Sequence, residues 1–274
     1  MPLVQLPRGL PARASAVREG GTGGGSGAAP PGNRTTLVKA LLVDLDDTLL
    51  DYSGGVEDSW RSACQTLATT AGVDAVALAD AVRIERRRFW DDVSRHRIER
   101  VNMMGAWTKI AANGLERMGA PSPELAARIA EDFAARRWAV MRLFPGVPEA
   151  LGRLCAAGVP MALVTNGDKS QQRRKIETYD LARFFEVIVI EGEFGAGKPE
   201  EIVYRHALER LGIAAAEAWM VGDHIEWDVA APQRLGLRGI WVDRDRTGLP
   251  EGTAVRPHRI VREFCELLDP TPSP

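Results

Sequence analysis

The sequence has few cysteines, no long apolar run and no excess of charge of either sign. Its three cysteines, Cys64, Cys155 and Cys265, lie far apart. An odd number without metal-ligand spacing argues against a disulfide framework and a zinc site. Reduced thiols and a cytoplasmic protein are therefore expected. No segment approaches the ~20 apolar residues of a membrane span, and the net charge of −2 offers no general attraction for nucleic acid or an anionic membrane.

Residues 1–36 differ in composition from the rest of the chain. They are rich in Gly, Pro, Ala and Ser and centre on a glycine-rich run over 20–27. Such a segment buries too little apolar surface to offset the entropy of ordering, so we expect a disordered extension. It lacks the apolar region of a secretory signal, and its arginines leave a transit peptide as the alternative. A dinucleotide-binding loop is excluded because Ser26 replaces the third glycine and no strand precedes it.

From Val38 onward, short apolar runs alternate with helical patterns. The predicted strands are 38–44, 160–165, 186–191, 218–222 and 239–243, and the predicted helices are 147–157, 169–179, 199–211 and 226–235. This alternation predicts a doubly wound, Rossmann-like α/β fold with a parallel sheet and helices on both faces. Pro232 falls inside the last helical pattern, so that helix should start late, bend, or begin as a tighter turn.

Residues 53–144 interrupt the alternation and contain no convincing strand. Helical periodicity covers 56–71, 76–94, 100–118 and 122–141. Four helices with short connections predict a small bundle. Because it follows the first strand directly, we expect it to cover the carboxyl edge of the sheet as a cap. The predicted domains are a core of residues 37–52 and 145–274 and a cap of residues 53–144.

Two closely spaced carboxylates follow the first predicted strand. Asp44 and Asp46 lie in the stretch Asp44-Leu45-Asp46-Asp47-Thr48, at the end of the strand where open α/β sheets bind ligands. Like charges this close are costly unless a cation neutralises them. A divalent metal ion with oxygen ligands suits this arrangement. One carboxylate is then available as a nucleophile and the other as a proton donor and acceptor.

Two further stretches suggest a binding site for an anion. Thr165 ends the second predicted strand, and the backbone N–H groups of Asn166 and Gly167 can form an anion nest. Lys198 stands between a glycine-containing loop and a proline that begins a predicted helix, so it can reach a phosphate as a point charge. Each stretch alone is more typical of an ordinary turn or a solvated lysine than of an anion site.

A fourth stretch adds two carboxylates after another buried strand. Asp223 follows Gly222, and Asp228 lies five residues further on, so both can approach one cation. The four stretches, in this order, resemble the motifs of the haloacid dehalogenase superfamily: a DxDxT loop, a strand-terminal Thr or Ser, a Lys, and a Gly-Asp acidic loop. The resemblance covers about residues 38–243. The insertion resembles the helical C1 cap, and the last two motifs are similar to the phosphoglycolate-phosphatase and N-acylneuraminate-9-phosphatase branch.

The resemblance implies an enzyme mechanism and a role for each residue. Asp44 would form an aspartyl-phosphate, and Asp46 would protonate the leaving alcohol and later deprotonate water. The implied phosphate-binding residues are Thr165, Asn166, Gly167 and Lys198. The implied Mg²⁺ ligands are Asp44, the backbone carbonyl of Asp46, Asp223 and Asp228. The chain is thus expected to be a Mg²⁺-dependent phosphatase of a small phosphorylated metabolite, a monomer or homodimer, with sheet order 3-2-1-4-5.

Several alternatives stay open within the same fold. Dehalogenases of the superfamily lack the second carboxylate and use no metal, so Asp46 argues against them. A phosphonate hydrolase would need a cap lysine, and Lys109 is the only lysine in residues 53–144. A sugar-phosphate mutase, another phosphotransferase, and a non-catalytic phosphate-binding regulatory protein are the remaining alternatives.

A few residues outside the motifs are also placed to contribute to the site or to the packing around it. Trp227, in the acidic loop, is expected to shape the pocket, whereas the tryptophans of the inserted helices are expected to pack in a core. His224 is expected to be exposed or to serve as a hydrogen-bonding group, because Mg²⁺ prefers oxygen ligands. The basic run near residue 85 predicts a solvated helix face, from which Arg83, Arg87 or Arg88 could contact a charged substrate.

Overall fold

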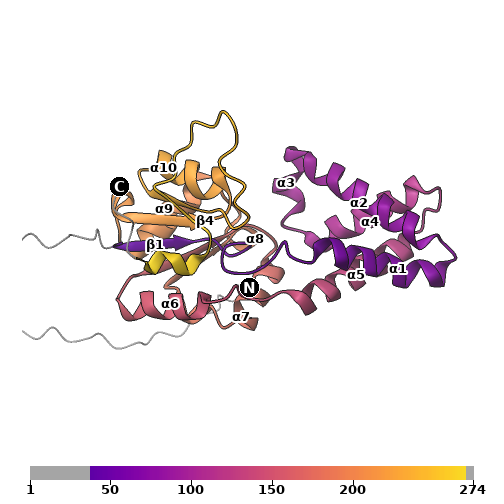
Figure 1. Ribbon diagram of the computed structural model, residues 1–274, viewed down its shortest axis with the longest axis horizontal. Helices are drawn as coiled ribbons and strands as arrows, with labels where there is room; N and C mark the ends of the chain where they lie inside the picture. Colours follow the sequence, from indigo (N-terminus) through magenta and orange to yellow (C-terminus); the bar gives the residue numbers. More distant parts are fainter. Residues whose placement is uncertain (1–37, 270–274) are drawn as a thin grey trace, which may run out of the picture. The chain divides into compact units, whose positions relative to one another are not determined.

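The computed structural model describes residues 38–269, and the predicted extension 1–36 lies outside this range. The described chain contains one six-stranded sheet in the order β3-β2-β1-β4-β5-β6, with every pair parallel (Figure 1). The strands are β1 (Ala40–Val43), β2 (Met161–Thr165), β3 (Val187–Ile190), β4 (Ala218–Gly222), β5 (Arg238–Val242) and β6 (Arg259–Val261). The predicted fold class and the order of five strands are confirmed. The sixth strand was missed because its three residues carry too short a pattern.

Helices cover both faces of the sheet, so that every residue of β1 and β2 is buried. They are α6 (Val147–Ala156), α7 (Lys169–Thr178), α8 (Glu191–Phe194), α9 (Glu201–Leu211) and α10 (Ala231–Arg234), with 3₁₀ turns at Ala182–Phe184, Ala215–Glu217 and Phe264–Leu268. Alternate residues of β1 belong to different cores: Leu41 and Val43 pack with α6, whereas Ala40 and Leu42 pack with α9. Figure 1 shows α6 and α9 on opposite sides of the strands.

Five helices follow β1, and all of them except the third share a hydrophobic core of their own. They are α1 (Val56–Ala71), α2 (Ala75–Asp91), α3 (Val93–Glu99), α4 (Met103–Arg117) and α5 (Pro123–Val140). Four helices were predicted, and α3 is the addition. The helix predicted to end at 94 ends at Asp91, because the side chain of Asp92 accepts a hydrogen bond from the Ser94 amide and begins a new helix. The division into a core domain and a cap domain stays a prediction.

The segment around Pro232 shows how a proline is accommodated. A π-helix covers Ile225–Ala230, and α10 begins only at Ala231, which places Pro232 in its first turn. Proline is tolerated there because a first-turn N–H has no partner within the helix. The expected late start is therefore observed, but the preceding turn is wider than an α-turn rather than tighter. No helix within residues 38–269 is long and apolar enough to cross a membrane.

Candidate active site

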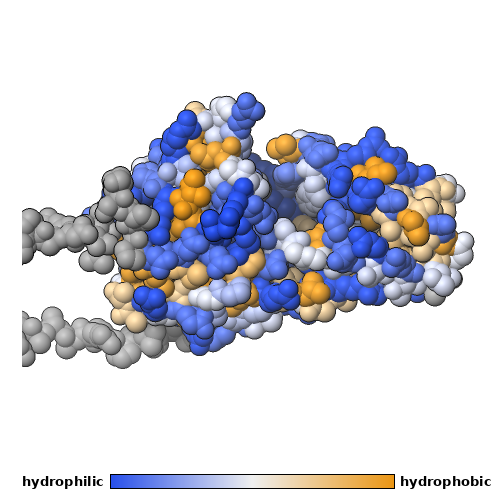
Figure 2. Space-filling model, in the orientation of Figure 1, coloured by the Kyte–Doolittle hydropathy of each residue, from blue (hydrophilic) through white to orange (hydrophobic). Residues whose placement is uncertain are grey.

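The loops that follow β1, β2 and β4 meet at one edge of the sheet and line a cavity of about 420 Å³. Parallel neighbouring strands end on the same edge, which is why residues far apart in sequence meet here. Figure 2 shows the surface hollowed beside α3, where residues of α1–α5 line the other side of the cavity. All eight predicted site residues line the cavity: Asp44, Asp46, Thr165, Asn166, Gly167, Lys198, Asp223 and Asp228.

Asp44 is held firmly at the floor of the cavity. Its backbone N–H donates to the carbonyl of Val221 at 2.9 Å, which continues the β1–β4 pairing. One carboxylate oxygen accepts from Lys198 Nζ at 2.5 Å and the other from the Thr48 hydroxyl at 3.0 Å. Burial raises the pKa of Asp44 to about 7; Lys198 opposes this effect, and the negative charge of Asp228 adds to it. The side chain is thus fixed in orientation beside a single lysine.

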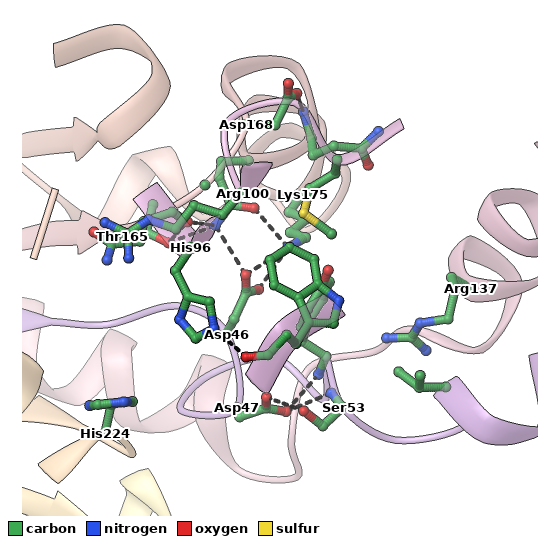
Figure 3. Close-up of a pocket in the computed structure, with 18 of the residues that line it drawn as sticks. Asp46, Asp47, Ser53, His96, Arg100, Arg137, Thr165, Asp168, Lys175 and His224 are labelled. Atoms are coloured by element: carbon green, nitrogen blue, oxygen red, sulfur yellow. Dashed lines mark hydrogen bonds and ion pairs between the residues drawn. The ribbon is translucent and has the colours of Figure 1, made fainter. Parts of the chain in front are cut away.

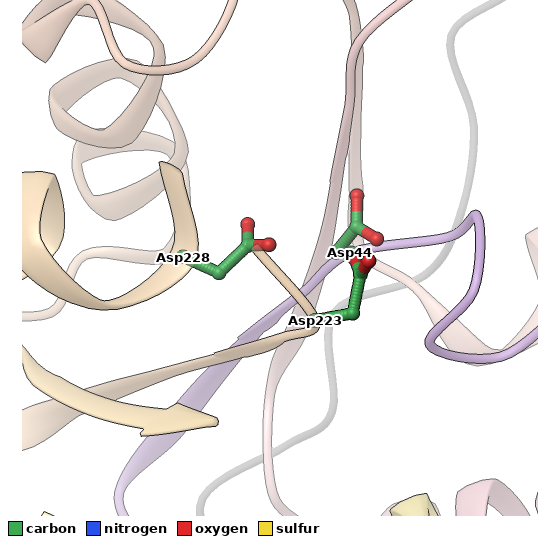
Figure 4. Close-up of side chains that lie close together, drawn as sticks. All are labelled: Asp44, Asp223 and Asp228. Atoms are coloured by element: carbon green, nitrogen blue, oxygen red, sulfur yellow. The ribbon is translucent and has the colours of Figure 1, made fainter. Parts of the chain in front are cut away.

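Two further carboxylates gather around Asp44, and the three have oxygen atoms close enough to share one cation. Asp44, Asp223 and Asp228 each offer an oxygen within 4.8 Å of the others (Figure 4). Burial and the charges of Asp44 and Asp228 raise the pKa of Asp223 to about 9. All three carboxylates, once ionised, would carry more negative charge than one lysine balances, and hard oxygen ligands are those that Mg²⁺ prefers. The residues present therefore fit a divalent cation.

A close approach of backbone to Asp228 makes this cluster possible. A Cβ atom on Gly222 would lie 2.2 Å from the Asp228 Cγ atom, so only glycine fits at the end of β4. Asp228 accepts from the His224 amide at 3.0 Å and from Lys198 Nζ at 2.7 Å. His224 itself is exposed, and its Nδ1 accepts from the Trp227 amide at 3.2 Å, as a hydrogen-bonding group rather than a member of the acidic cluster.

Lys198 is buried between two carboxylates, and Asn166 positions its backbone. The Asn166 side chain donates to the Lys198 carbonyl at 2.8 Å and accepts from the Lys198 amide at 2.7 Å. Burial lowers the pKa of Lys198, but Asp228 and Asp44 outweigh burial and raise the pKa above its usual range. The ammonium group therefore keeps its proton and provides a fixed positive charge beside Asp44.

Asp46 points to a different set of partners, which the sequence patterns did not reveal. Its two carboxylate oxygens accept from Lys175 Nζ at 2.8 and 2.7 Å, and one also accepts from Gln172 Nε2 at 3.1 Å (Figure 3). Gln172 also donates to the Thr165 hydroxyl oxygen at 2.6 Å. One signal was available: α7 has almost no apolar residues, yet it must bury one face against the sheet. Its buried residues are Gln172, Lys175 and Ile176, so polar side chains occupy that face.

Glu191 connects the loop after β2 to the helical segment. It accepts from the Gly167 amide at 2.9 Å, so this N–H, expected to be available to an anion, is engaged within the protein. The same carboxylate receives the Arg100 guanidinium through Nε at 2.7 and 2.9 Å and Nη2 at 2.6 Å. Arg100 ends α3, and its Cζ also lies 5.1 Å from the centre of the Trp227 ring. The expected contribution of Trp227 to the pocket is consistent with its place in the cavity wall.

The whole motif order is matched by one family model, which describes haloacid dehalogenase-like hydrolases and covers residues 38–236. The chain belongs to the haloacid dehalogenase-like hydrolase family. The prediction of this superfamily is therefore confirmed, and so is the prediction that the chain is a hydrolase.

Relatives of this haloacid dehalogenase-like hydrolase include proteins named as phosphatases. Phosphoserine phosphatase of Thermus thermophilus is 34% identical over 84% of this chain and 98% of its own. N-acylneuraminate-9-phosphatase of Rattus norvegicus is 27% identical over 84% of this chain and 92% of its own. Among solved structures, the hydrolase YfnB of Bacillus subtilis bound to magnesium has a TM-score of 0.65, with 21% identity over 84% of this chain and 96% of its own. This last likeness concerns the fold alone.

The helical side of the cavity differs in detail from what the sequence predicted for this hydrolase. Of the basic run in α2, Arg86 lines the cavity, whereas Arg83, Arg87 and Arg88 do not. The pattern alone could not orient the helix, and the packing of α2 against α1 and α4 turns Arg86 inward. Trp60 stacks on Phe133 with ring centres 3.9 Å apart, so it packs in the helical core as expected and also lines the cavity.

Proposed function

We propose that this protein is a Mg²⁺-dependent phosphatase that hydrolyses a small phosphorylated metabolite through an aspartyl-phosphate intermediate. The observation that carries the proposal is the position of Asp44, which is buried beside Lys198 at the edge of the cavity and belongs to a cluster of three carboxylates. The phosphatase names of the relatives support the same reaction. The cavity of about 420 Å³ suits a small ester.

In the first step, a carboxylate oxygen of Asp44 attacks phosphorus in line with the leaving group. The P–O bond to the alcohol breaks, its electron pair stays on the leaving oxygen, and Asp46 donates a proton to that oxygen. Lys198 places positive charge beside the phosphoryl oxygens, where the negative charge of the transition state is spread. The Thr165 hydroxyl accepts from Gln172 at 2.6 Å and donates a long hydrogen bond of 3.4 Å to the Asn166 carbonyl. Turned toward the substrate, the same proton can be donated to one of the phosphoryl oxygens.

In the second step, Asp46 takes a proton from a water molecule whose oxygen attacks the same phosphorus. The bond between phosphorus and Asp44 breaks, which returns the carboxylate and releases inorganic phosphate. Lys175 holds both oxygens of Asp46 and so keeps this side chain in one place during both proton transfers.

Asp44, Asp223 and Asp228 would hold Mg²⁺, with the backbone carbonyl of Asp46 as a further ligand. The ion would neutralise the clustered carboxylates and polarise the phosphoryl group. Without it, the excess negative charge opposes binding of a dianionic ester, because like charges repel strongly in a partly buried site.

The rival activities find less support. Asp46 has no place in a metal-free dehalogenase, yet its carboxylate is bound by Lys175 and lines the cavity. A phosphonate hydrolase would use a cap lysine, but Lys109 pairs with Glu99 at 2.6 Å and does not line the cavity. A mutase would transfer the phosphoryl group back to a sugar rather than to water, so release of inorganic phosphate distinguishes it.

Hydrolysis of 4-nitrophenyl phosphate with and without Mg²⁺ tests the proposal. Phosphate release should require the metal ion, and Asp44→Asn should lower kcat by roughly a factor of 10⁴ or more because the nucleophile is lost. Asp58→Asn is the matched control, since Asp58 is an exposed residue paired with Arg61 outside the cavity. Turnover that survives in Asp44→Asn would remove Asp44 from the role of nucleophile.

A further inference from the structure

The helical side of the cavity contains one buried guanidinium that forms no ion pair with a carboxylate of residues 38–269, although Asp46, Asp47 and Asp51 lie near enough to act on its charge. Arg137 lies in the last turn of α5, is only 2% exposed, and faces the cavity (Figure 3). Its Nη1 donates to the Gly54 carbonyl at 2.6 Å, and its Cζ lies 5.3 Å from the centre of the Tyr52 ring. Its buried Nη2 has no hydrogen-bond partner among residues 38–269.

The other cationic side chains that line the cavity already have acidic partners. The pairs are Arg86 with Glu57, Arg100 with Glu191, Lys175 with Asp46, and Lys198 with Asp44 and Asp228. Within the described lining, Arg137 is thus the exception. A buried charge without a counter-ion and a buried N–H without an acceptor both cost free energy, so a feature of this kind indicates a partner outside the chain.

The hydrogen bond to Gly54 does not by itself explain why an arginine is buried at this position. That carbonyl needs one donor, and Nη1 supplies it. A guanidinium offers several N–H groups in a rigid, planar arrangement that matches a planar anion. In Arg137, Nη2 is the nitrogen whose N–H groups have no acceptor among the described residues. Burial lowers the pKa of Arg137, yet the group stays protonated at neutral pH because the ordinary pKa of arginine is so high.

We propose that Arg137 binds a carboxylate of the substrate, so that the enzyme acts on phosphate monoesters of small carboxylic acids. This inference rests on the proposed function, which places the phosphoryl group of the same substrate at Asp44. A carboxylate fits better than a second phosphate, because the single unpaired cation balances one negative charge and would leave a dianion partly uncompensated. The apolar rings of Trp60, Trp107 and Phe133 in the same lining suit the carbon skeleton between the two anionic groups.

Two pairs of substrates isolate the carboxylate. O-phosphoserine and O-phosphoethanolamine differ only in this group, and 3-phosphoglycerate and glycerol 3-phosphate differ by a carboxylate in place of a hydroxymethyl group. The measured quantity is the ratio of kcat/KM within each pair, with saturating Mg²⁺. Because both members are measured on one preparation, partial unfolding of a variant cancels in the ratio. The wild type should favour the carboxylate member of at least one pair.

Three variants then test the residue. Arg137→Gln should lower the ratio about 10- to 100-fold, the effect expected when a charge-assisted hydrogen bond is lost. Arg137→Lys keeps the positive charge but not the planar guanidinium, so its ratio should lie between those of Arg137→Gln and the wild type. Arg136→Gln is the matched control: Arg136 is the neighbouring arginine of α5, pairs with Asp132 at 2.6 Å and does not line the cavity, so the ratio should stay at the wild-type value.

The outcomes separate the inference from the proposed function. If Arg137→Gln still hydrolyses 4-nitrophenyl phosphate and its ratio equals that of the wild type, the carboxylate site is refuted while the phosphatase stands. If Arg137 is instead needed to prefer fructose 1,6-bisphosphate over fructose 6-phosphate, a second phosphate is the ligand and the carboxylate is refuted. A wild type that hydrolyses none of these esters refutes the proposed function, and the inference falls with it.

Discussion

Replacing Lys175 by methionine removes the charge that holds Asp46 and keeps most of the length of the side chain. Lys175 is 2% exposed, and its ammonium group makes two contacts with Asp46 and one with the Gln172 side chain at 2.7 Å. In Lys175→Met, all three contacts are lost. Asp46 remains present but keeps only the Gln172 amide as a side-chain partner among those observed.

The expected loss of stability in Lys175→Met follows from how deeply each partner of the Lys175–Asp46 ion pair is buried. Breaking a fully buried ion pair costs about 3–5 kcal/mol, but the Asp46 side chain is 23% exposed and water can solvate it. The desolvation of the lysine, which lowers the pKa of Lys175, also disappears. We therefore expect a loss of about 1–3 kcal/mol in stability, which is a fall of roughly 3–10 °C in Tm for a domain of this size.

The effect on catalysis should depend on the leaving group. A positioned general acid contributes about 10²–10⁴-fold, and it matters most for alkyl phosphates, whose alkoxide needs a proton. Lys175→Met loses the position of Asp46 but not its carboxyl group, so kcat/KM for an alkyl phosphate should fall about 10- to 100-fold. For 4-nitrophenyl phosphate, which needs no acid, the fall should be smaller.

The assay compares both substrates in the wild type, Lys175→Met and Lys169→Met. Lys169 is an exposed lysine of the same helix and serves as the matched control. Thermal unfolding followed by circular dichroism gives Tm. An alkyl-phosphate kcat/KM in Lys175→Met equal to that of the wild type would refute the positioning role. Equal losses for both substrates would refute it too, since they would indicate general damage.

Two further predictions concern the acidic cluster. In metal-free protein, Asp44 and Asp223 have pKa values of about 7 and about 9, so the folded chain keeps protons that the unfolded chain releases near pH 4. The free energy of unfolding in EDTA should therefore fall as the pH rises from about 5 to about 9, and saturating Mg²⁺ should abolish the decline. Thermal unfolding curves at both pH values check this prediction. A Tm in EDTA that rises with pH contradicts it. Gly222→Ala forces the Asp228 carboxylate to move, so the Mg²⁺ concentration for half-maximal activity should increase by about 10-fold or more, and an unchanged Mg²⁺ titration contradicts this prediction.

The strands and the motif residues could be predicted because their signals are local. The apolar run ending at Val43 defines β1, and β4 begins at Ala218 and ends at Gly222 as predicted. Once the strands are parallel neighbours, their carboxyl ends must meet, so Asp44 and Asp223 come together without knowledge of the packing. These are the positions where strand pattern and chemistry coincide in one short stretch of chain.

The residues that were missed come from helices, whose orientation depends on tertiary packing. Lys175 and Arg137 lie on helical faces that a single sequence does not orient, and Arg100 sits at the end of α3, a helix created by the Asp92 cap. Periodicity marks a face as buried only when that face is apolar. A buried face that is polar, as in α7, therefore escapes the pattern, although it is the face that forms the site.

Glu191 has an energetic consequence for turnover. This side chain is 4% exposed, accepts a hydrogen bond from the Gly167 amide and forms an ion pair with the Arg100 guanidinium. Were α3 to swing away to let product leave, Glu191 would stay behind as a lone anion in a poorly hydrated niche, and this penalty would draw the arginine back. Any movement of α3 away from Glu191 would therefore have to break a buried ion pair, and dissolved salt would weaken that attraction once water had entered.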